Sequence, residues 1–524
     1  MALPTTECDV LVVGSGNAGF SAAISAAETK VGDRKPTVLL IDKCPKDWVG
    51  GNSYFTAGAY RTTHGGLADV LPLVNNVSAD QAAKIDLAPY TSDDFQKDMD
   101  NVCMGHSDKD LARVLISDSR STIQWLKDNG IRFQLSFNRQ AYEVDGKIKF
   151  WGGLCLKTEN GGKGLIEDHI AAAKRNGVLM SWNTGLTRVQ RQEKSSRYRF
   201  LATVLVDGQE SSISAKSIIF AAGGFESNPK LRSQYLGPGW DMAMVRGTPY
   251  NMGDCLELAI RDLDALPVGN WSGCHSTCWD ANADPSVGDR DASNEYTKSG
   301  YPLGLMLNVE GDRFVDEGVA MRNYTYAKFG RAILQQPDHV AFQVWDARTT
   351  HWLRSEEYRP ERLKENSFTA DTIEGLADLL SANGLRDRGR FIMTLNEYNE
   401  AVYAFQRENP SAKWDPSILD GVSTQSTAKQ LSLAKSNWAL PMDKGPFLAV
   451  KVTCGVTFTF GGLKVDAETA TLVSSTTRQA IPGLFGVGEM IGGLFYYNYP
   501  GGSGLTSGAV FGRRAGRAAA EGSH

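Results

Sequence analysis

Three glycines near the start of the chain have the spacing of a phosphate-binding loop. Gly14, Gly16 and Gly19 lie between a predicted buried strand, Asp9–Val13, and an alanine-rich stretch typical of a helix, Phe20–Glu28. In such a unit the first glycine permits a tight turn, the second lets the backbone approach a pyrophosphate, and the third allows close packing of helix on strand. The helix start then offers its N–H groups to the phosphates. The pattern predicts a dinucleotide site.

Asp42 could supply a second contact in this site. It follows a strand predicted over Thr37–Ile41, at the distance beyond the glycines where an acid accepts hydrogen bonds from an adenosine ribose. The same residue could instead be an ordinary turn residue that closes the strand. Together with the glycines, an acid here favours a dinucleotide with an unphosphorylated ribose, which means FAD or NAD.

Further glycine-rich segments come where predicted strands end or predicted helices begin. A flexible loop would have a similar composition. The last segment enters a helix predicted to run through Arg517, and the N–H groups at such a helix start can stabilise an anionic reduced flavin. In chain order the segments are Gly50–Ser53 followed by Ala57 and Gly58, Ala221–Phe225, Asn251–Asp254, Ile481–Glu489 and Gly501–Leu505.

The elements that must position these segments can be recognised from turn and periodicity signals. Asp207 and Gly208 between Arg199–Val206 and Glu210–Ala215 are a strong signal of a β-hairpin, and a further buried strand is expected over Ser217–Phe220. The middle of the chain is expected to contain two helices and a solvated basic turn. These lie at Thr372–Asn383, Thr394–Glu408 and Arg386–Arg390.

Length and charge restrict the class of protein. With 524 residues, 42% of them hydrophobic, the chain is too long for one simple domain, and two domains are expected. A net charge of −5 does not indicate binding to DNA, RNA or an anionic membrane, which positively charged proteins favour. The sequence contains no run of about 18 apolar residues, so no membrane-spanning helix is expected. The first residues do not resemble a signal peptide, so we expect a cytoplasmic protein.

The cysteines do not predict a metal site. Cys274, His275 and Cys278 form the only dense group among eight scattered cysteines. A structural metal would need four ligands, and no second cluster supplies the rest. Buried reduced thiols are the better interpretation, and no metal is expected.

The order of these motifs along nearly the whole chain resembles the flavoprotein family of fumarate reductases, succinate dehydrogenases, 3-ketosteroid dehydrogenases and tricarballylate dehydrogenases. The resemblance decides for FAD over NAD. It implies an α/β fold with a Rossmann-like FAD-binding domain formed by both chain ends, residues 1–269 and 458–524. An α+β capping domain, residues 270–457, is then inserted between them.

The resemblance also implies which residues hold the cofactor. Succinate dehydrogenases tether FAD through a histidine near the Gly-Gly segment, where this chain has Gly51-Asn52-Ser53-Tyr54, so we expect non-covalent FAD. The implied contacts fall into four groups along the chain. They are Gly51, Asn52, Ser53 and Gly58 near the flavin, Ala222 and Gly223 along the adenine half, Asp254 and Glu489 at the ribityl chain, and Ser503 and Leu505 at the final helix.

Two polar residues of the expected cap resemble substrate-binding residues of the family. His275, within Asn270–Thr277, matches the histidine that holds a substrate carboxylate, although it could be a structural histidine. Arg322 follows Gly311–Glu317, with a one-residue difference from the segment that presents the proton-delivering arginine of fumarate reductases. It could instead form a surface ion pair with Glu317. Arginine stays protonated, so it would act as a relay, and its fork suits a carboxylate.

Two expected polar anchors are replaced by aromatic residues. Phe458 stands where fumarate reductases have a second substrate-binding histidine, and Tyr499 where they have an arginine, which makes fumarate itself doubtful as substrate. The segments Thr457–Gly462 and Asn498–Gly504 look more like those of tricarballylate dehydrogenases, and Tyr-Pro-Gly-Gly is also similar to ketosteroid dehydrogenases. Tyr499 could hydrogen-bond a carboxylate or carbonyl, act as a base if its pKa is lowered from near 10, or pack beside the flavin.

The resulting hypothesis is α,β-dehydrogenation of a small, tricarballylate-like polycarboxylate. His275 and Arg322 would bind the carboxylate beside the reacting carbon, Arg322 or Tyr499 would remove the proton, and the neighbouring carbon would give hydride to the flavin. The reverse alkene reduction would use the same residues. No haem or iron–sulfur ligands are recognisable in the sequence, so the electron acceptor is expected to be another protein, a quinone or dioxygen.

Three alternatives remain open at this point. A ketosteroid-type enone dehydrogenase would favour an aromatic pocket with few cations. A redox-neutral, FAD-dependent isomerase would use the flavin for shape or transient redox. A nicotinamide enzyme without flavin is disfavoured because no second GxGxxG is present.

Overall fold

The chain folds into two compact units in a computed structural model that describes residues 3–137, 141–144, 146–150, 153–193, 195–416 and 418–522. Unit 1 consists of Met1–Gly237, Gly247–His275 and Thr457–His524, and unit 2 of Pro238–Arg246 and Ser276–Val456. The predicted assignment of one part to FAD binding and the other to substrate capping stays a prediction.

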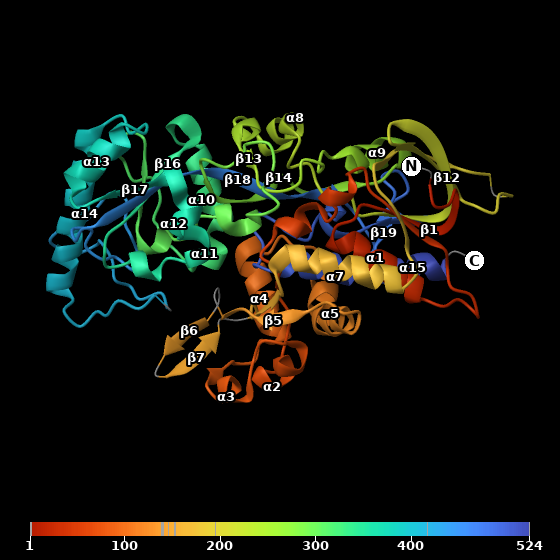
Figure 1. Ribbon diagram of the computed structural model, residues 1–524, viewed down its shortest axis with the longest axis horizontal. Helices are drawn as coiled ribbons and strands as arrows, with labels where there is room; N and C mark the ends of the chain where they lie inside the picture. Colours follow the sequence, from red (N-terminus) through yellow and green to blue (C-terminus); the bar gives the residue numbers. More distant parts are fainter. Residues whose placement is uncertain are drawn as a thin grey trace. The chain divides into compact units, whose positions relative to one another are not determined.

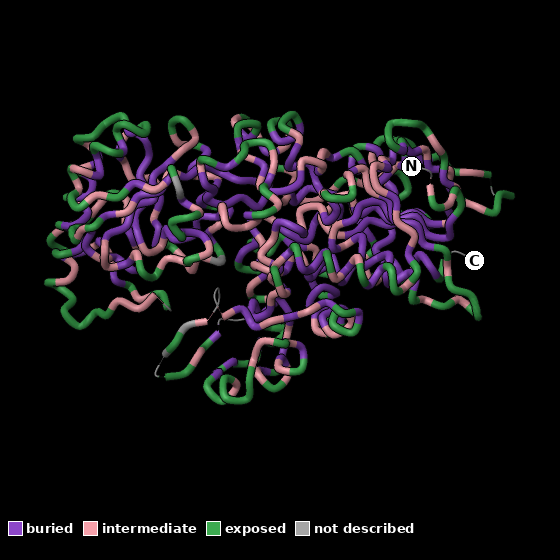
Figure 2. Tube along the Cα trace, in the orientation of Figure 1, coloured by how far each residue is buried: buried purple, intermediate pink, exposed green. Residues whose placement is uncertain are grey.

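Unit 1 is built on an eight-stranded sheet. Its main path runs β10 (Thr184–Arg191), β11 (Phe200–Val206), β12 (Gln209–Phe220), β1 (Glu7–Val13), β2 (Val38–Ile41) and β9 (Leu179–Ser181). β20 (Ala480–Gly486) pairs with β12 and with β19 (Thr471–Val473). β1 is buried along its length except at Glu7, as expected for a strand covered on both faces (Figure 2).

Four parallel strands of this sheet end at one edge. Val13 pairs with Ile41 and Phe220, and Phe220 pairs with Gly486, so the loops after β1, β2, β12 and β20 leave the sheet side by side. Ligands of open α/β sheets bind at the carboxyl ends of parallel strands. The register therefore gathers the glycine loop, Asp42, the Ala221–Phe225 segment and Glu489 at that edge.

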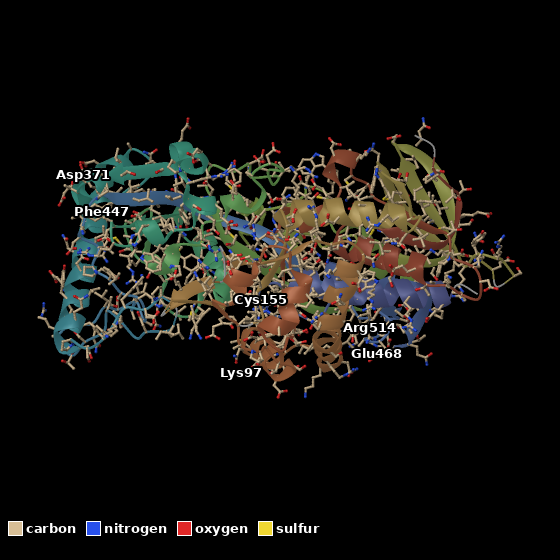
Figure 3. All side chains as sticks on the ribbon, turned by 60° about the horizontal axis from the view of Figure 1, so that its bottom comes forward. Lys97, Cys155, Asp371, Phe447, Glu468 and Arg514 are labelled. Carbon is tan, nitrogen blue, oxygen red and sulfur yellow. The ribbon has the colours of Figure 1, made fainter. Side chains whose placement is uncertain are left out.

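Helices α1 (Asn17–Glu28) and α15 (Ser503–Glu521) pack against each other and join the two ends of the chain (Figure 1). Glycines make the close approach possible. A Cβ at Gly512 would lie 2.6 Å from the Ala18 carbonyl oxygen, and one at Gly516 would lie 2.2 Å from that of Ala22. At the far end, Arg514 forms an ion pair of 2.7 Å with Glu468 (Figure 3).

The rest of unit 1 consists of shorter elements around a second core that includes Tyr60, Phe133 and Leu165. Its helices are α2 (Leu67–Val70), α3 (Ala79–Ala82), α4 (Ser92–Cys103), α5 (Lys109–Asp128), α7 (Gly161–Arg175), α8 (Pro229–Leu231) and α9 (Asp254–Leu263). Two three-stranded sheets are formed by β3 (Ala59–Tyr60), β8 (Leu156–Thr158) and β5 (Phe133–Leu135), and by β4 (Ile85–Asp86), β7 (Lys147–Phe150) and β6 (Ala141–Val144).

Unit 2 is organised around a six-stranded sheet, of which β14 and β18 continue along the chain into residues of unit 1. The strands are β13 (Met244–Val245), β14 (Pro267–Asp280), β15 (Leu305–Asn308), β16 (Ala341–Trp345), β17 (Ser367–Ala370) and β18 (Phe447–Leu463). Its helices are α10 (Tyr326–Leu334), α11 (Ser355–Tyr358), α12 (Pro360–Leu363), α13 (Ile373–Ser381) and α14 (Arg388–Glu408).

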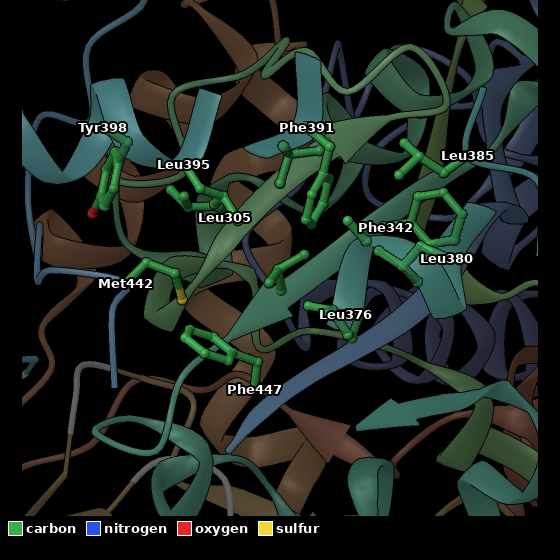
Figure 4. Close-up of a cluster of buried hydrophobic side chains, with 14 of the residues drawn as sticks. Leu305, Phe342, Leu376, Leu380, Leu385, Phe391, Leu395, Tyr398, Met442 and Phe447 are labelled. Carbon is green, nitrogen blue, oxygen red and sulfur yellow. The ribbon is translucent and has the colours of Figure 1, made fainter. Parts of the chain in front are cut away.

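The core of unit 2 lies between this sheet and helices α13 and α14. Leu305 and Phe342 of the strands pack with Leu376 of α13 and with Phe391 and Leu395 of α14 (Figure 4). All five side chains are fully buried. Burial of such a cluster, at about 25 cal/mol per Å² of apolar surface, is the main stabilising contribution of this unit.

Several predicted elements are confirmed, and two are wrong in extent. The hairpin turns at Asp207 and Gly208, whose φ values of +48° and +83° suit a tight two-residue turn. The strand predicted as separate at Ser217–Phe220 is the continuation of β12 beyond the hairpin. The basic run predicted as a solvated turn includes the start of α14, because Asp387 caps the helix by accepting from the N–H of Arg390.

Candidate active site

The glycine loop has the shape that its spacing predicts. Gly14 has φ +109°, and a Cβ there would lie 2.3 Å from the Ala221 carbonyl oxygen. A Cβ at Gly19 would lie 1.9 Å from the carbonyl oxygen of Gly14. At Gly16 the nearest atom would be 3.6 Å away, so chain packing does not demand glycine at this position. A ligand that approaches the backbone at residue 16 would explain the glycine, because a side chain there would block the ligand.

Asp42 is tied to this loop by hydrogen bonds. The N–H and hydroxyl groups of Ser15 donate to its Oδ2 at 2.7 and 2.6 Å, and the N–H of Cys44 donates to Oδ1 at 3.0 Å. These bonds fix the carboxylate beside the turn. This position is compatible with the predicted ribose contact. It is equally compatible with the alternative, in which Asp42 is only the turn residue that closes the strand.

Asp254 lies near this strand end as well. It is the first residue of α9, its side chain is 54% exposed, and it forms an ion pair with Lys43, the residue after Asp42. The contact with Lys43 associates Asp254 with the end of β2. A role at the ribityl chain remains a prediction for this residue.

Asn52 and Ser53 connect a 3-10 turn, Gly51–Phe55, to the start of α1. The N–H of Asn17 donates to Ser53 Oγ at 3.0 Å. Asn52 donates to the carbonyl oxygen of Thr457 at 2.5 Å and to a carboxylate oxygen of Glu226. The predicted cofactor residues of this turn therefore lie among groups from both ends of unit 1.

The remaining predicted cofactor positions follow the same edge. Gly51, Gly58 and Gly223 have positive φ values of +50°, +69° and +74°, which glycine adopts readily. A Cβ at Gly58 would lie 2.0 Å from Thr158 Oγ1, so packing of the chain already requires glycine there. Ala222 lies in the loop after β12, two residues beyond its last residue, Phe220.

Glu489 and Glu226 bring two carboxyl groups into this site. Glu489 accepts from the N–H and hydroxyl of Thr459 at 2.7 and 2.9 Å. Burial raises the pKa of Glu489 to about 7. Glu226 is wholly buried, and burial together with the charge of Glu489 raises its pKa well above the ordinary value for glutamate.

Sequence reasoning missed Asn17, Glu226 and Asn251 as site residues. Asn17 donates to the Leu505 carbonyl oxygen at 2.8 Å, so one side chain joins the glycine loop to α15. Its Oδ1 accepts from the hydroxyl of Tyr60 at 2.7 Å, and the ring nitrogen Nε2 of His169 lies 3.0 Å away. The available signal was position: all three missed residues are polar and lie within or directly beside the glycine-rich segments.

The start of α15 is a further part of the candidate site. Ser503 is its first residue, and its hydroxyl donates to the Pro500 carbonyl oxygen at 2.6 Å. Gly502, with φ +84°, precedes the helix. The first turn of α15 thus presents the positive end of a 19-residue helix.

His275, Phe458 and Tyr499 come together in unit 1. The imidazole of His275 and the ring of Tyr499 are perpendicular with centroids 5.0 Å apart, and the rings of Phe458 and Tyr499 are 5.5 Å apart. A Cβ on Gly504 of α15 would lie 3.4 Å from Tyr499 and 3.6 Å from Phe458. Phe495 adds a further ring, 5.6 Å from Tyr499.

Arg322 belongs to unit 2, where it begins a short 3-10 helix, Arg322–Tyr324. Its carbonyl oxygen accepts from the N–H and the hydroxyl of Thr325, both at 3.1 Å. The ion pair with Glu317 considered from sequence does not form: Glu317 is wholly buried and pairs with Arg313 at 2.5 Å. The guanidinium of Arg313 is also held by the carbonyl oxygen of Leu433, to which it donates at 2.9 Å.

The described residues show neither a disulfide nor a metal cluster. All eight cysteines are buried thiols. Within the described residues, no group of three or more metal-binding side chains could hold an ion. The helices of the described part include none that is long and apolar enough to cross a membrane.

Comparison with known proteins identifies the cofactor. Residues 84–505 match the family model described as FAD binding domain, which covers well over half of the chain. The chain belongs to this family. FAD is therefore its cofactor, and the protein is an FAD-dependent oxidoreductase acting on CH–CH bonds, within the broader group of fumarate reductase, succinate dehydrogenase and 3-ketosteroid dehydrogenase flavoproteins.

Individual relatives agree over nearly the full chain. The fumarate reductase (cytochrome) of Shewanella frigidimarina is 28% identical over 99% of this chain and 78% of its own length. The urocanate reductase of Eggerthella lenta is 26% identical over 98% of this chain and 75% of its own.

Solved structures share the fold. The open conformation of a flavocytochrome c3 fumarate reductase matches with a TM-score of 0.70 and 23% identity over 99% of this chain and 79% of that one. The 3-ketosteroid delta1-dehydrogenase of Sterolibacterium denitrificans matches with a TM-score of 0.71 and 18% identity over 98% and 100%. These likenesses confirm the predicted α/β fold class.

The geometry of unit 1 fits FAD. The unhindered backbone at Gly16 and the helix starts of α1 and α15 suit a ligand with a pyrophosphate and an electron-rich ring. Asp42 offers acceptors for ribose hydroxyl groups at the same edge. We therefore expect the loop around Gly16 and Asp42 to hold the adenosine end, and Asn52, Ser53, Glu489 and the start of α15 to hold the rest.

Proposed function

We propose that the protein catalyses α,β-dehydrogenation of a small, tricarballylate-like polycarboxylate, or the reverse alkene reduction. The observation that carries the proposal is the contact of His275 with Tyr499 beside Phe458 at the start of α15. It places an imidazole and a phenol, both able to hydrogen-bond a carboxylate, within an otherwise aromatic wall. Fumarate and urocanate, after which two relatives are named, are also carboxylates with a C=C bond.

The residues of this wall have separate tasks in the proposal. When bound, FAD supplies the group that accepts or donates a hydride. His275 binds one substrate carboxylate oxygen, and the positive end of α15 stabilises negative charge that develops near it. Phe458 and Phe495 keep water out, which strengthens these polar interactions.

Proton transfer is assigned to Arg322 or Tyr499. Arg322 carries a planar cation that can bind a carboxylate with two parallel hydrogen bonds. As a base it must pass one of its own protons to a neighbouring carboxylate as it takes the substrate proton, because its ordinary pKa keeps it protonated. Tyr499 could take the proton directly, and its hydroxyl is carried by a ring already held between His275 and Phe458.

We also propose that electrons pass to a separate protein, quinone or dioxygen, and that the protein works in the cytoplasm.

We further propose that FAD is held without a covalent bond. Denaturation with acid should then release all FAD into the supernatant. Retention of yellow colour in the washed precipitate would contradict the non-covalent assignment.

One alternative has an observation in its favour. The rings of Phe458, Phe460, Phe495 and Tyr499 form a continuous aromatic cluster, with neighbouring centroids 5.2 to 6.3 Å apart. Such a surface suits a hydrophobic enone, as in a ketosteroid-type dehydrogenase. A redox-neutral isomerase has no comparable observation in its support.

Anaerobic bleaching of the flavin tests the proposal. Tricarballylate should reduce the bound FAD and remove its visible absorbance, while 3-ketosteroids should leave it unchanged. Arg322→Ala should slow bleaching by at least about 100-fold, the usual contribution of a proton-transfer group. Arg386→Ala, which removes a surface arginine paired with Glu310 and Asp338, is the matched control and should bleach like wild type.

Other outcomes would change the assignment. Bleaching by steroid ketones alone would favour the enone alternative. Reoxidation of pre-reduced FAD by alkene polycarboxylates, without bleaching by any saturated acid, would make the protein a reductase. Isomerisation without any change in flavin absorbance would identify the redox-neutral alternative.

A further inference from the structure

Two carboxyl side chains meet at the edge of the unit 1 sheet. Glu226 lies in the loop after β12, and Glu489 lies in a 3-10 turn, Gly488–Met490, after β20. Because Phe220 pairs with Gly486, both loops leave the sheet at the same level. A Cβ at Gly224, two residues before Glu226, would lie 2.2 Å from Glu489 Oε1, so the carboxyl group of Glu489 lies against the loop that carries Glu226.

The described donors around the pair leave one carboxylate oxygen of Glu226 without a hydrogen bond. Glu226 Oε1 accepts from the amide nitrogens of Asn52 and Asn251, the latter at 2.5 Å. No donor among the described residues reaches Glu226 Oε2, which is fully buried. Glu489 Oε1 is occupied by the N–H and hydroxyl of Thr459.

An unpaired buried carboxylate oxygen is costly, and two ionised carboxylates have no proton with which to bond each other. One proton between them removes both penalties, as in other carboxyl pairs that share a site. The other side chains that bind the pair, from Asn52, Asn251 and Thr459, are neutral. One cation also contacts Glu226: the guanidinium of Arg232 donates to its main-chain oxygen at 2.5 Å.

We propose that Glu226 and Glu489 share one proton at neutral pH, with Glu226 as the acid that donates to Glu489, and that this pair sets the affinity of the protein for FAD. Glu226 is a positioning residue in this scheme. It acts through Asn52 and Glu489, the residues predicted to contact the cofactor. The inference concerns cofactor binding alone and does not depend on the proposed substrate.

A pH dependence follows from the exposure of the pair. Glu226 is wholly buried, whereas Glu489 is partly exposed. FAD bound beside Glu489 withdraws water from it, which favours the protonated pair. As the pH rises through the pKa of the pair, the shared proton leaves, the two carboxylates repel each other, and FAD should bind more weakly.

Titration of FAD-free protein with FAD tests this inference. Between about pH 6 and pH 9, the Kd of wild type should rise by up to about tenfold per pH unit once the pair deprotonates. Glu226→Gln keeps the acceptor for both asparagines and replaces the shared proton by an amide N–H. Its Kd should vary by less than about threefold over the same range, since one pKa unit corresponds to a tenfold effect. Flavin fluorescence reports both.

The exposed Glu257 of α9 provides a matched control, and Glu257→Gln should reproduce the wild-type profile. A wild-type Kd that is constant with pH would overturn the proposal. Proton sharing would equally be wrong if Glu226→Gln kept the wild-type slope.

Infrared spectroscopy of wild type keeps the proposal testable if the variant does not fold. Protein labelled with carbon-13 at glutamate carboxyl groups should show the C=O stretch of a protonated carboxylic acid at neutral pH. The band should disappear at high pH. Its absence at neutral pH would refute proton sharing without any substitution.

Discussion

At the scale of single residues, the site combines one imidazole with rings that replace charged anchors. His275 is 7% exposed and lies edge-on to Tyr499. The histidine was predictable from its segment, and so were Phe458 and Tyr499. The role of Glu226 was not, because an acid beside a glycine loop reveals neither its burial nor its partner 263 residues further along, at Glu489. Only the pairing of β12 with β20 brings those two together.

His275→Asn tests the carboxylate contact. Asparagine retains a hydrogen-bond donor but lacks the imidazole ring, so we expect kcat/KM with tricarballylate to fall by about 10- to 100-fold, mainly through a higher KM. FAD content should not change. His351→Asn, at an exposed histidine of unit 2, should leave steady-state kinetics at the wild-type level. Normal kinetics in the His275 variant would make this histidine structural.

At the scale of elements, local signals were enough for much of unit 1 but not for every boundary. The first strand, the first helix and the hairpin follow from periodicity and turn residues in a few neighbouring positions. β12 was divided into two strands because its outer half pairs with β11 and its inner half with β1 and β20. Different partners give the two halves different patterns of burial, which sequence periodicity reads as two elements.

The close contact of α15 with α1 makes a sharp prediction. Gly512→Val places a branched side chain against the Ala18 carbonyl oxygen, and overpacking of this kind costs about 1–3 kcal/mol. We expect a lower melting temperature and weaker FAD retention. Arg517→Val, at an exposed position of the same helix, is the control that introduces valine without a close neighbour. Equal melting temperatures of the two variants would show that α15 can shift without loss.

At the scale of the whole molecule, stability should depend on pH through the buried acid pair. The pKa of Glu226 is higher in the folded chain than in the unfolded chain. Glu226 therefore contributes fully to the free energy of unfolding below its pKa in the unfolded chain, about 4.3. This contribution is lost as the pH rises through the pKa of Glu226 in the folded chain. Because glutamine does not ionise, Glu226→Gln should abolish this loss of stability at high pH.

Thermal unfolding of FAD-free protein measures the effect. The Glu226→Gln variant and wild type should melt at similar temperatures at about pH 5, and the variant should melt at the higher temperature at about pH 8. Glu257→Gln should follow wild type at both values. A variant that becomes relatively less stable at the higher pH would contradict the sign of the pKa shift.

The hydrogen bond from Asn17 to Leu505 also has a consequence for biosynthesis. It spans 488 residues, so the first helix formed on the ribosome waits for the last one to emerge. Long-range closure of this kind slows folding and leaves early segments exposed during synthesis. Nascent chains arrested before residue 503 should fail to capture FAD and should be cleaved readily at α1 by added protease, whereas released full-length chains should resist. Cofactor loading then requires that α15 has left the ribosome.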